Sequence, residues 1–219
     1  MQPPKEPIPD LIGFYRDRIR HHGLDYEAMW GDSSSWKSDV RFNPIVFLPM
    51  GAESVLVDVG CGTGELASFL RRNKPGVKYI GVEAVPEFAA EARTRQGVEV
   101  HEIDAFTDPE QLPEADWYVS FGTMNKQWSI SNLKGSTDEE KIFGYFDLLY
   151  QKARVGVAVS LTTSVVDFLK PGVCNMSPEA TASHLSSLSP HFFIYHGYPL
   201  YEFFCAAWRG TRGSREVNP

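Results

Sequence analysis

The sequence has few cysteines and no long apolar run. Its three cysteines, Cys61, Cys174 and Cys205, form no CxxC pair, so neither a disulfide framework nor a metal site is expected, and a cytoplasmic location is predicted. No segment reaches the roughly 18 consecutive apolar residues of a membrane span, and the first ten residues lack the apolar run of a signal peptide. We therefore expect neither a membrane partner nor export.

Basic charge is also scarce. The chain has 28 acidic and 21 basic side chains, which gives a formal net charge of -7, and such a charge repels a polyanion. Nucleic acid is therefore not an expected partner. One predicted helix does carry a basic cluster of Arg16, Arg18, Arg20, His21 and His22. We interpret it as a solvated helix face, and the alternative is a docking face for a macromolecule.

The length of 219 residues suits one α/β domain. Apolar spacing predicts a helix over Leu11–Gly23, closed by its glycine, and a second over Trp36–Phe47. The predicted organisation is a flexible tail over 1–10, a helical lid segment over 11–50, the main domain over 51–209 and a frayed tail over 210–219.

From Ser54 onward, apolar runs alternate with helical patterns, which indicates a parallel sheet covered by helices on both faces. The predicted strands are Val55–Val59, Val77–Val82, Val98–Ile103, Trp117–Phe121, Val155–Leu161, Phe192–Tyr195 and Glu202–Trp208. The predicted helices are Glu65–Arg72, Pro86–Arg95, Asp138–Ala153 and Pro178–Ser187. Only His196–Tyr201 separates the last two strands, so these should pair antiparallel. We expect a Rossmann-like, seven-stranded, mostly parallel sheet of five strand–helix units with an antiparallel last strand.

A glycine-rich turn follows the first predicted strand. Asp58–Gly64 reads DVGCGTG, and its glycines let backbone and ligand approach without a Cβ between them. A dinucleotide fingerprint has its third glycine at the sixth position of GxGxxG, whereas here it is the fifth and Glu65 is the sixth. A carboxylate there would repel a pyrophosphate, but it would attract the cationic sulfonium and ammonium of S-adenosylmethionine.

This turn resembles the first motif, DxGxGxG, of class I methyltransferases. The resemblance implies that S-adenosylmethionine is the cofactor, that Asp58 lies near its methionine amino group, and that the turn lines it through Gly60, Cys61, Gly62 and Gly64.

Two more acids end the next two predicted strands. Glu83 matches the ribose-binding acid of the family, with Ala84 beside it. Asp104 matches the acid that faces the adenine amino group, and the following amide, of Ala105, faces the ring. Three acids at three consecutive strand ends favour the methyltransferase interpretation over helix caps.

The fourth predicted strand ends at Ser120–Gly122, where open α/β sheets bind ligands. We expect Ser120 and Gly122 beside the methionine portion. The stretch also resembles the SGxFN segment of a group of poorly characterised small bacterial methyltransferases. Trp30–Phe42 resembles the same group, and Arg41 matches an arginine of that segment. We expect Arg41 to pair with the cofactor carboxylate, and an exposed helical arginine is the alternative.

Methyl transfer requires the acceptor to be aligned and, where needed, deprotonated. Asn125 follows the fourth strand, and His196 and Tyr198 follow the sixth, so we expect them near the acceptor. His196 is the first candidate for a general base, because histidine titrates near neutral pH. The alternative is a turn histidine. Aromatic residues of the lid segment either stack on a flat acceptor or only seat the lid; they are Tyr15, Tyr26, Trp30 and Trp36.

The leading hypothesis is methyl transfer to nitrogen or oxygen of a small molecule, as in secondary metabolism, by a monomer or homodimer. The (D/N)PP(Y/F) tetrapeptide of enzymes that methylate amino groups of DNA is missing after the fourth strand, which further disfavours nucleic acid. Three alternatives stay open: a methyltransferase of a protein or RNA, a cofactor-binding protein without catalysis, and a dehydrogenase.

Overall fold

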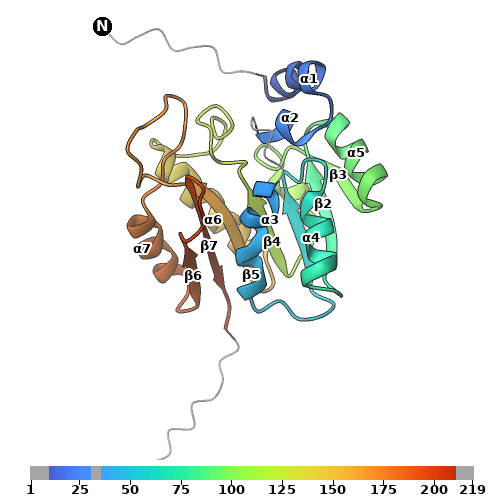
Figure 1. The fold of residues 1–219 in the computed structure, drawn as a ribbon. Helices are drawn as coiled ribbons and strands as arrows, with labels where there is room; N and C mark the ends of the chain where they lie inside the picture. The colour runs from blue at the N-terminus through green and yellow to red at the C-terminus, as the bar shows by residue number, and fades with distance from the viewer. Residues whose placement is uncertain (1–9, 31–35, 211–219) are drawn as a thin grey trace, which may run out of the picture.

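A seven-stranded sheet forms the centre of the protein (Figure 1). The structure is a computed structural model, and it describes residues 10–30 and 36–210. The strand order is β3-β2-β1-β4-β5-β7-β6. The strands are β1 (Val55–Val59), β2 (Lys78–Glu83), β3 (Glu99–Glu102), β4 (Trp117–Phe121), β5 (Gly156–Thr162), β6 (Phe192–Tyr195) and β7 (Glu202–Trp208). Only β7 runs antiparallel to its neighbours, so the expected Rossmann-like sheet is confirmed.

Helices cover both faces of this sheet (Figure 1). The α-helices are α1 (Leu11–His22), α2 (Tyr26–Trp30), α3 (Trp36–Phe42), α4 (Glu65–Asn73), α5 (Pro86–Gln96), α6 (Asp138–Lys152) and α7 (Pro178–Leu188), and two 3-10 helices are η1 (Asn43–Phe47) and η2 (Pro109–Gln111). Apolar residues of α3, η1 and α4 form one core cluster with the sheet, and those of α6 and α7 form another on the opposite face. Among the described helices, none has the length and apolar content needed to cross a membrane.

Successive side chains of the central strands belong alternately to these two clusters. Leu56 of β1 belongs to the cluster under α4, whereas Val57 and Val59 belong to the cluster under α6, because successive side chains of a strand point to opposite faces. Every residue of β4 is buried, as expected for a strand covered on both faces.

Three sequence predictions were wrong in detail. The expected helix over Trp36–Phe47 ends at Phe42 and continues as the 3-10 helix η1, because Pro44 has no N–H for an α-helical bond. The short helix α2 was not predicted, since five residues show no clear periodicity. The connection from β3 to β4 contains η2 but no α-helix, so the count of five strand–helix units was too high. The predicted tails lie mostly outside the described residues, at 1–9 and 211–219.

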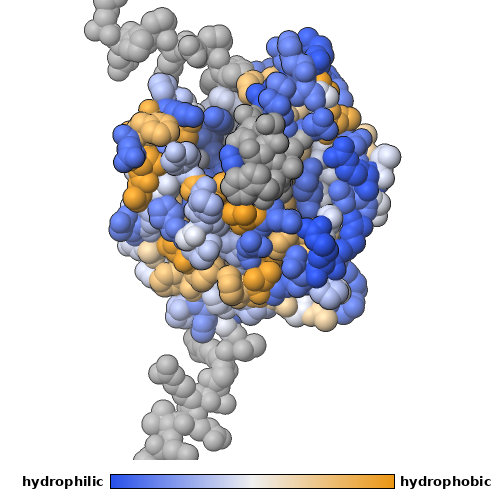
Figure 2. All heavy atoms as spheres, viewed as in Figure 1, coloured by the Kyte–Doolittle hydropathy of each residue, from blue (hydrophilic) through white to orange (hydrophobic). Residues whose placement is uncertain are grey.

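The visible surface is largely hydrophilic over α4 and α5, and hydrophobic residues gather over the connection between β5 and α7 (Figure 2). In that connection Val165, Phe168 and Leu169 are exposed. The basic cluster of α1 is largely neutralised: Arg16 pairs with Glu87 at 2.6 Å and Arg20 with Asp17 at 2.9 Å.

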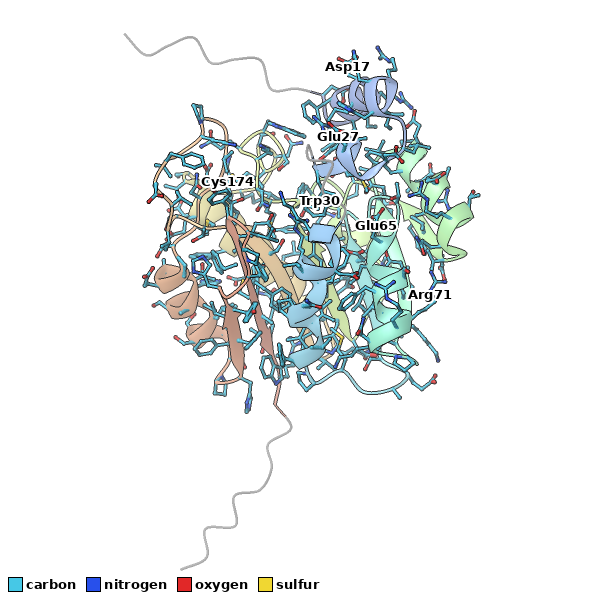
Figure 3. All side chains as sticks on the ribbon, viewed as in Figure 1. Asp17, Glu27, Trp30, Glu65, Arg71 and Cys174 are labelled. Atoms are coloured by element: carbon cyan, nitrogen blue, oxygen red, sulfur yellow. The ribbon has the colours of Figure 1, made fainter. Side chains whose placement is uncertain are left out.

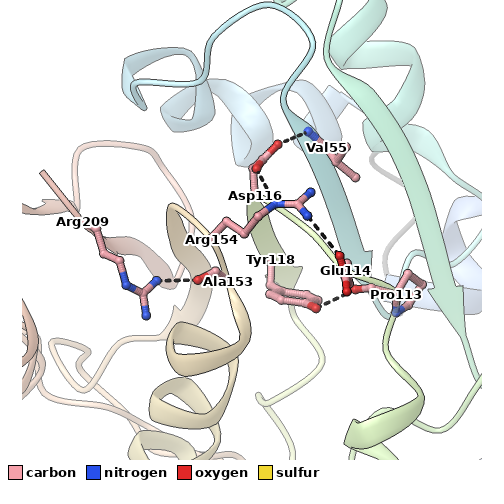
Figure 4. Close-up of polar contacts among 8 residues, drawn as sticks. All are labelled: Val55, Pro113, Glu114, Asp116, Tyr118, Ala153, Arg154 and Arg209. Carbon is pink, nitrogen blue, oxygen red and sulfur yellow. Dashed lines mark hydrogen bonds and ion pairs between the residues drawn. The ribbon is translucent and has the colours of Figure 1, made fainter. Parts of the chain in front are cut away.

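A polar cluster joins the strands at their amino ends (Figure 4). One oxygen of Asp116 accepts a hydrogen bond from the Val55 amide at 2.7 Å, and the other accepts from Arg154 Nε at 2.9 Å. The Tyr118 hydroxyl donates to the Pro113 carbonyl at 2.6 Å. Asp116 thus joins the start of β1 to the connection between α6 and β5.

Asp116→Ala should lower the free energy of unfolding by about 1–3 kcal/mol, because it leaves the Val55 amide and the Arg154 guanidinium without their shared acceptor. Urea denaturation measures this loss. The control is Glu114→Ala: its side chain also contacts Arg154 but is 92% exposed, so we expect a change within about 0.5 kcal/mol. Equal losses in the two variants would contradict the central role of Asp116.

Candidate active site

The carboxyl ends of β1, β2, β3 and β4 surround a cavity. It encloses about 980 Å³, its open mouth included, which is within the usual range for small-molecule sites. The helices α1 and α2 lie over this end of the sheet (Figure 1) and contribute Leu11, Tyr15, Met29 and Trp30 to the walls. The cavity is therefore formed jointly by the sheet and the amino-terminal helices.

The glycine-rich turn forms the floor of this cavity. The amides of Gly60 and Cys61 both donate to the Val82 carbonyl, at 2.8 and 3.0 Å. Gly60 and Gly62 have positive φ angles of 74° and 56°, which residues with a Cβ rarely adopt. A Cβ on Gly62 would lie 2.4 Å from Met29 Sδ. The turn thus requires glycine there both for its backbone conformation and for close packing.

Glu83 holds the turn to the end of β2. One carboxylate oxygen accepts from the Gly62 amide at 2.8 Å, and the other accepts from the Val85 amide at 2.9 Å. Burial raises the pKa of Glu83, and the backbone hydrogen bonds oppose that rise. A carboxylate offers about four acceptor positions, so Glu83 keeps acceptor capacity for a ligand hydroxyl beside its backbone hydrogen bonds.

Asp58 is buried at the end of β1 and accepts a hydrogen bond from the Tyr79 hydroxyl at 2.9 Å. Burial raises the pKa of Asp58 to about 7; the Tyr79 hydrogen bond opposes the rise, and the nearby Glu83 and Glu65 add to it. Asp104, at the end of β3, accepts from the Phe106 amide at 3.0 Å. The three predicted acids therefore do line one cavity.

The charge of this cavity is one-sided. Its described walls carry four carboxylates, of Asp58, Glu65, Glu83 and Asp104, and no lysine, arginine or histidine. Such a site attracts a cation and repels a phosphate. Glu65 and Trp30 both lie near the upper end of the sheet, whereas Asp17 and Arg71 lie on the outer surface (Figure 3).

Most of the predicted cofactor residues line the cavity. Besides the acids and the turn residues Gly60, Cys61 and Gly62, they include Ala84, Ala105 and Gly122. Gly64 instead caps α4, and a Cβ on it would lie 3.3 Å from the Ala92 Cβ. Ser120 is buried, and its hydroxyl donates to the Val59 carbonyl at 2.9 Å. Gly64 and Ser120 thus support the site from outside its walls.

Arg41 is not an exposed helical arginine, because only 5% of it is accessible. Its Nε and Nη2 atoms donate to the two carboxylate oxygens of Glu202 at 2.9 and 2.8 Å. It does not line the cavity, and a direct contact with the cofactor carboxylate stays a prediction.

The structure does not bring Asn125, His196 and Tyr198 to the cavity walls. The Asn125 side-chain oxygen accepts from the Thr162 amide at 3.0 Å. Tyr198 is buried in the core cluster under α3 and α4. His196 is exposed after β6, and β5 and β7 lie between β6 and β4. At about 4.8 Å per strand, the sheet alone separates β6 from β4 by roughly 14 Å.

Sequence reasoning missed several residues of the walls. They include Met29, Phe42, Phe88, Phe106, Phe121 and Thr123. Phe121 ends β4 one residue before the predicted Gly122, so its position carried a signal. Met29 and Phe42 come from short helices that pack over the sheet, and nothing in the sequence showed which of their faces would point inward. The side chains of Tyr26 and Trp36 lie outside the described residues.

The three cysteines are spread along the chain, and one of them, Cys61, lines the cavity. All three cysteines are free and buried. Among the described residues, no group of three or more His, Cys, Asp or Glu side chains is arranged to hold a metal ion.

Comparisons with known proteins match the same region. Residues 56–135 match the family model described as a methyltransferase domain. A search of curated protein sequences found no match.

Solved structures of methyltransferases share the fold. Magnesium protoporphyrin IX methyltransferase from Synechocystis PCC 6803, with bound SAH, is 15% identical with a TM-score of 0.61, over 89% of this chain and 97% of that chain. Human N-acetylserotonin methyltransferase in complex with SAM is 21% identical with a TM-score of 0.62, over 94% of this chain and 61% of that chain. The mitomycin 7-O-methyltransferase is 15% identical with a TM-score of 0.59, over 89% of this chain and 60% of that chain. This chain therefore spans about three fifths of the length of the last two.

The matched segment runs from β1 past the end of β4 and includes the glycine-rich turn and all three strand-end acids. Residues 56–135 thus match a methyltransferase domain, and the fold is that of methyltransferases solved with SAM or SAH bound.

Gly62→Ala should weaken binding of S-adenosylhomocysteine, the demethylated cofactor, by at least about tenfold, or 1.4 kcal/mol. The added Cβ would clash with Met29 Sδ, so the Met29 side chain must move at the cavity wall, and the positive φ of Gly62 strains the turn as well. Isothermal titration calorimetry measures the loss.

Gly97→Ala is the matched control. Gly97 has a similar φ of 62°, but nothing lies within 4 Å of the added Cβ. Both variants should lose about 1–2 kcal/mol of unfolding free energy from backbone strain, whereas only Gly62→Ala should lose affinity. Equal affinities would show that the close contact at Gly62 is unimportant for the site.

Proposed function

We propose that this protein transfers a methyl group from S-adenosylmethionine to a small molecule bound in the cavity under α1 and α2. The observation that carries the proposal is the one-sided charge of the walls, with four carboxylates and no described basic side chain. The cofactor is cationic at its sulfonium and ammonium, so it complements this charge. A nicotinamide dinucleotide, with its pyrophosphate, does not.

In this proposal, each of the three strand-end acids binds a different part of the cofactor. Asp58 receives the methionine ammonium beside the glycine turn. Glu83 keeps acceptor capacity beyond its backbone hydrogen bonds, which suits the ribose hydroxyls. Asp104 and the Ala105 amide face the adenine. These assignments follow the strand order β3-β2-β1, along which the acids stand side by side.

The bound cofactor supplies a methyl carbon already activated by the sulfonium. The protein then has to hold the acceptor in line with that carbon and to exclude water. The cavity does both through its apolar wall residues, among them Leu11, Tyr15 and Trp30. These residues close the site on the side opposite the sheet.

A small acceptor fits this enclosure better than a macromolecule. The solved structures named above include a magnesium protoporphyrin IX methyltransferase, an N-acetylserotonin methyltransferase and a mitomycin 7-O-methyltransferase. The basic cluster of α1 offers little to RNA, since Arg16 and Arg20 pair with acids and Arg18 donates to the carbonyls of Glu27 and Ala28. Methylation of nitrogen or oxygen in a secondary metabolite is consistent with such a site.

The affinity for S-adenosylhomocysteine should depend on pH through Asp58. Burial keeps the pKa of Asp58 near 7, so below that pH the carboxyl is neutral and cannot pair with the ligand ammonium. The association constant should fall by up to about tenfold per pH unit below 7 and level off above it. Calorimetry over one pH unit on either side of 7 tests this.

Two variants separate Asp58 from other titrating groups. Asp58→Asn should bind weakly and with no step near pH 7. Tyr79→Phe removes the hydrogen bond that favours the ionised carboxylate, so the step should move to higher pH. An unchanged step in Asp58→Asn would assign it to another group and remove Asp58 from the ammonium site.

The reaction is tested by incubating the protein with methyl-labelled cofactor and a panel of small amines, phenols and heterocycles. Label should appear in a small-molecule product, and Asp58→Asn should reduce its yield at least about tenfold, as for a loss of 1.4 kcal/mol. Gly97→Ala should retain most of the yield. Label found only in added RNA or protein would contradict the proposal.

A further inference from the structure

Aromatic rings gather at the β4 end of the cavity, away from the adenosine side. Trp30 of α2, Phe42 of α3 and Phe121 of β4 all line it, and we call them the aromatic subsite. The Phe42 and Phe121 ring centroids are 5.0 Å apart in an edge-to-face arrangement. Tyr15, Phe88 and Phe106 stand instead near the ends of β2 and β3. A molecule next to the methionine end of the cofactor therefore meets mainly ring faces and edges.

Trp30 is held firmly in this subsite. Its ring lies 3.7 Å from the Arg41 guanidinium carbon, and Arg41 is fixed by its two hydrogen bonds to Glu202. A Cβ on Gly122 would lie 2.5 Å from the Trp30 ring, so the ring rests directly on the β4 turn. A buried ion pair contributes little to stability by itself. Here it positions a ring that forms part of the cavity wall.

The described wall carboxylates all accept a hydrogen bond from the protein itself. Glu83 and Asp104 accept backbone hydrogen bonds, and Asp58 accepts one from Tyr79. Glu65 accepts from the Thr63 hydroxyl. Burial raises the pKa of Tyr15 to about 12 and that of Cys61 well above its usual range. An alcohol or a weakly acidic phenol would therefore have to share a carboxylate that already accepts a hydrogen bond.

We propose that the acceptor is a flat nitrogen heterocycle that stacks in the aromatic subsite and is methylated on a neutral ring nitrogen. This inference rests on the proposed function and narrows it to a substrate class. The nitrogen lone pair forms the new N–CH₃ bond, while the C–S bond breaks and its electron pair stays on sulfur. Positive charge passes from sulfur to nitrogen, and no proton leaves.

The cavity suits that movement of charge. The product is a cation, and aromatic faces and carboxylates both stabilise a cation. The negative charge of the site comes from its wall carboxylates. These carboxylates repel an acceptor that itself bears a carboxylate or a phenolate. A ring nitrogen that is neutral near pH 7 needs no base.

The binding test uses protein saturated with S-adenosylhomocysteine and four probes: quinoline, N-methylquinolinium, 2-naphthol and 2-naphthoate. Calorimetry should show N-methylquinolinium binding at least about tenfold more tightly than 2-naphthoate. Trp30→Leu should reduce N-methylquinolinium binding by about fivefold or more, and Trp30→Phe should restore much of it. Phe47→Leu is the control, because Phe47 is 67% exposed and lies outside the cavity.

The turnover test uses methyl-labelled cofactor with quinoline or 2-naphthol. Formation of N-methylquinolinium, detected by mass spectrometry as a fixed cation, supports the inference. Methylation of 2-naphthol without quinoline, or binding of 2-naphthoate as tight as that of N-methylquinolinium, overturns it and leaves the proposed function standing. Failure of S-adenosylhomocysteine to bind the wild-type protein overturns the proposed function itself. Thermal unfolding of each Trp30 variant shows whether a loss of binding reflects a loss of folding.

Discussion

The Glu83 carboxylate, which accepts hydrogen bonds from Gly62 and Val85, is the interaction on which the site depends. It joins the turn after β1 to the start of α5, and the Val82 carbonyl reinforces that join through Gly60 and Cys61. Together these bonds hold the glycine turn over the end of β2, between the strand ends that carry Asp58 and Asp104. One side chain thus both shapes the cavity floor and contributes to its negative charge.

That negative charge has a cost in the free protein. Burial raises the pKa of both Asp58 and Glu83, which means that the folded chain holds these carboxylates in an environment unfavourable to their ionised form. A cationic ligand offsets this unfavourable burial, because its positive charge stabilises the ionised form of the carboxylates. The same reasoning links donor and acceptor: a cavity built for a sulfonium is also suited to a product in which the charge has moved to nitrogen. Perturbed carboxyl groups are typical of functional sites.

The sheet and the cavity walls at the ends of β1, β2 and β3 were largely predictable, whereas the walls that come from α2 and α3 were not. Asp58, Glu83 and Asp104 each end a strand whose apolar run is visible in the sequence, and parallel strands bring their carboxyl ends to one edge. Arg41 and Glu202 are 161 positions apart, so no local pattern could pair them. His196 was expected near the acceptor because it follows a strand, but β7 inserts between β5 and β6 and moves that strand end to the far edge of the sheet. The faces of α2 and α3 depend on tertiary packing, and their inward residues Met29 and Phe42 became evident only in the fold.

The central claim is that the turn at the end of β1 binds S-adenosylmethionine rather than a dinucleotide. Calorimetric titration of the wild-type protein with S-adenosylhomocysteine and, separately, with NAD tests it most directly. The account predicts one saturable site per chain for S-adenosylhomocysteine and no saturable binding of NAD at the same concentrations. Tighter binding of NAD than of S-adenosylhomocysteine would contradict it.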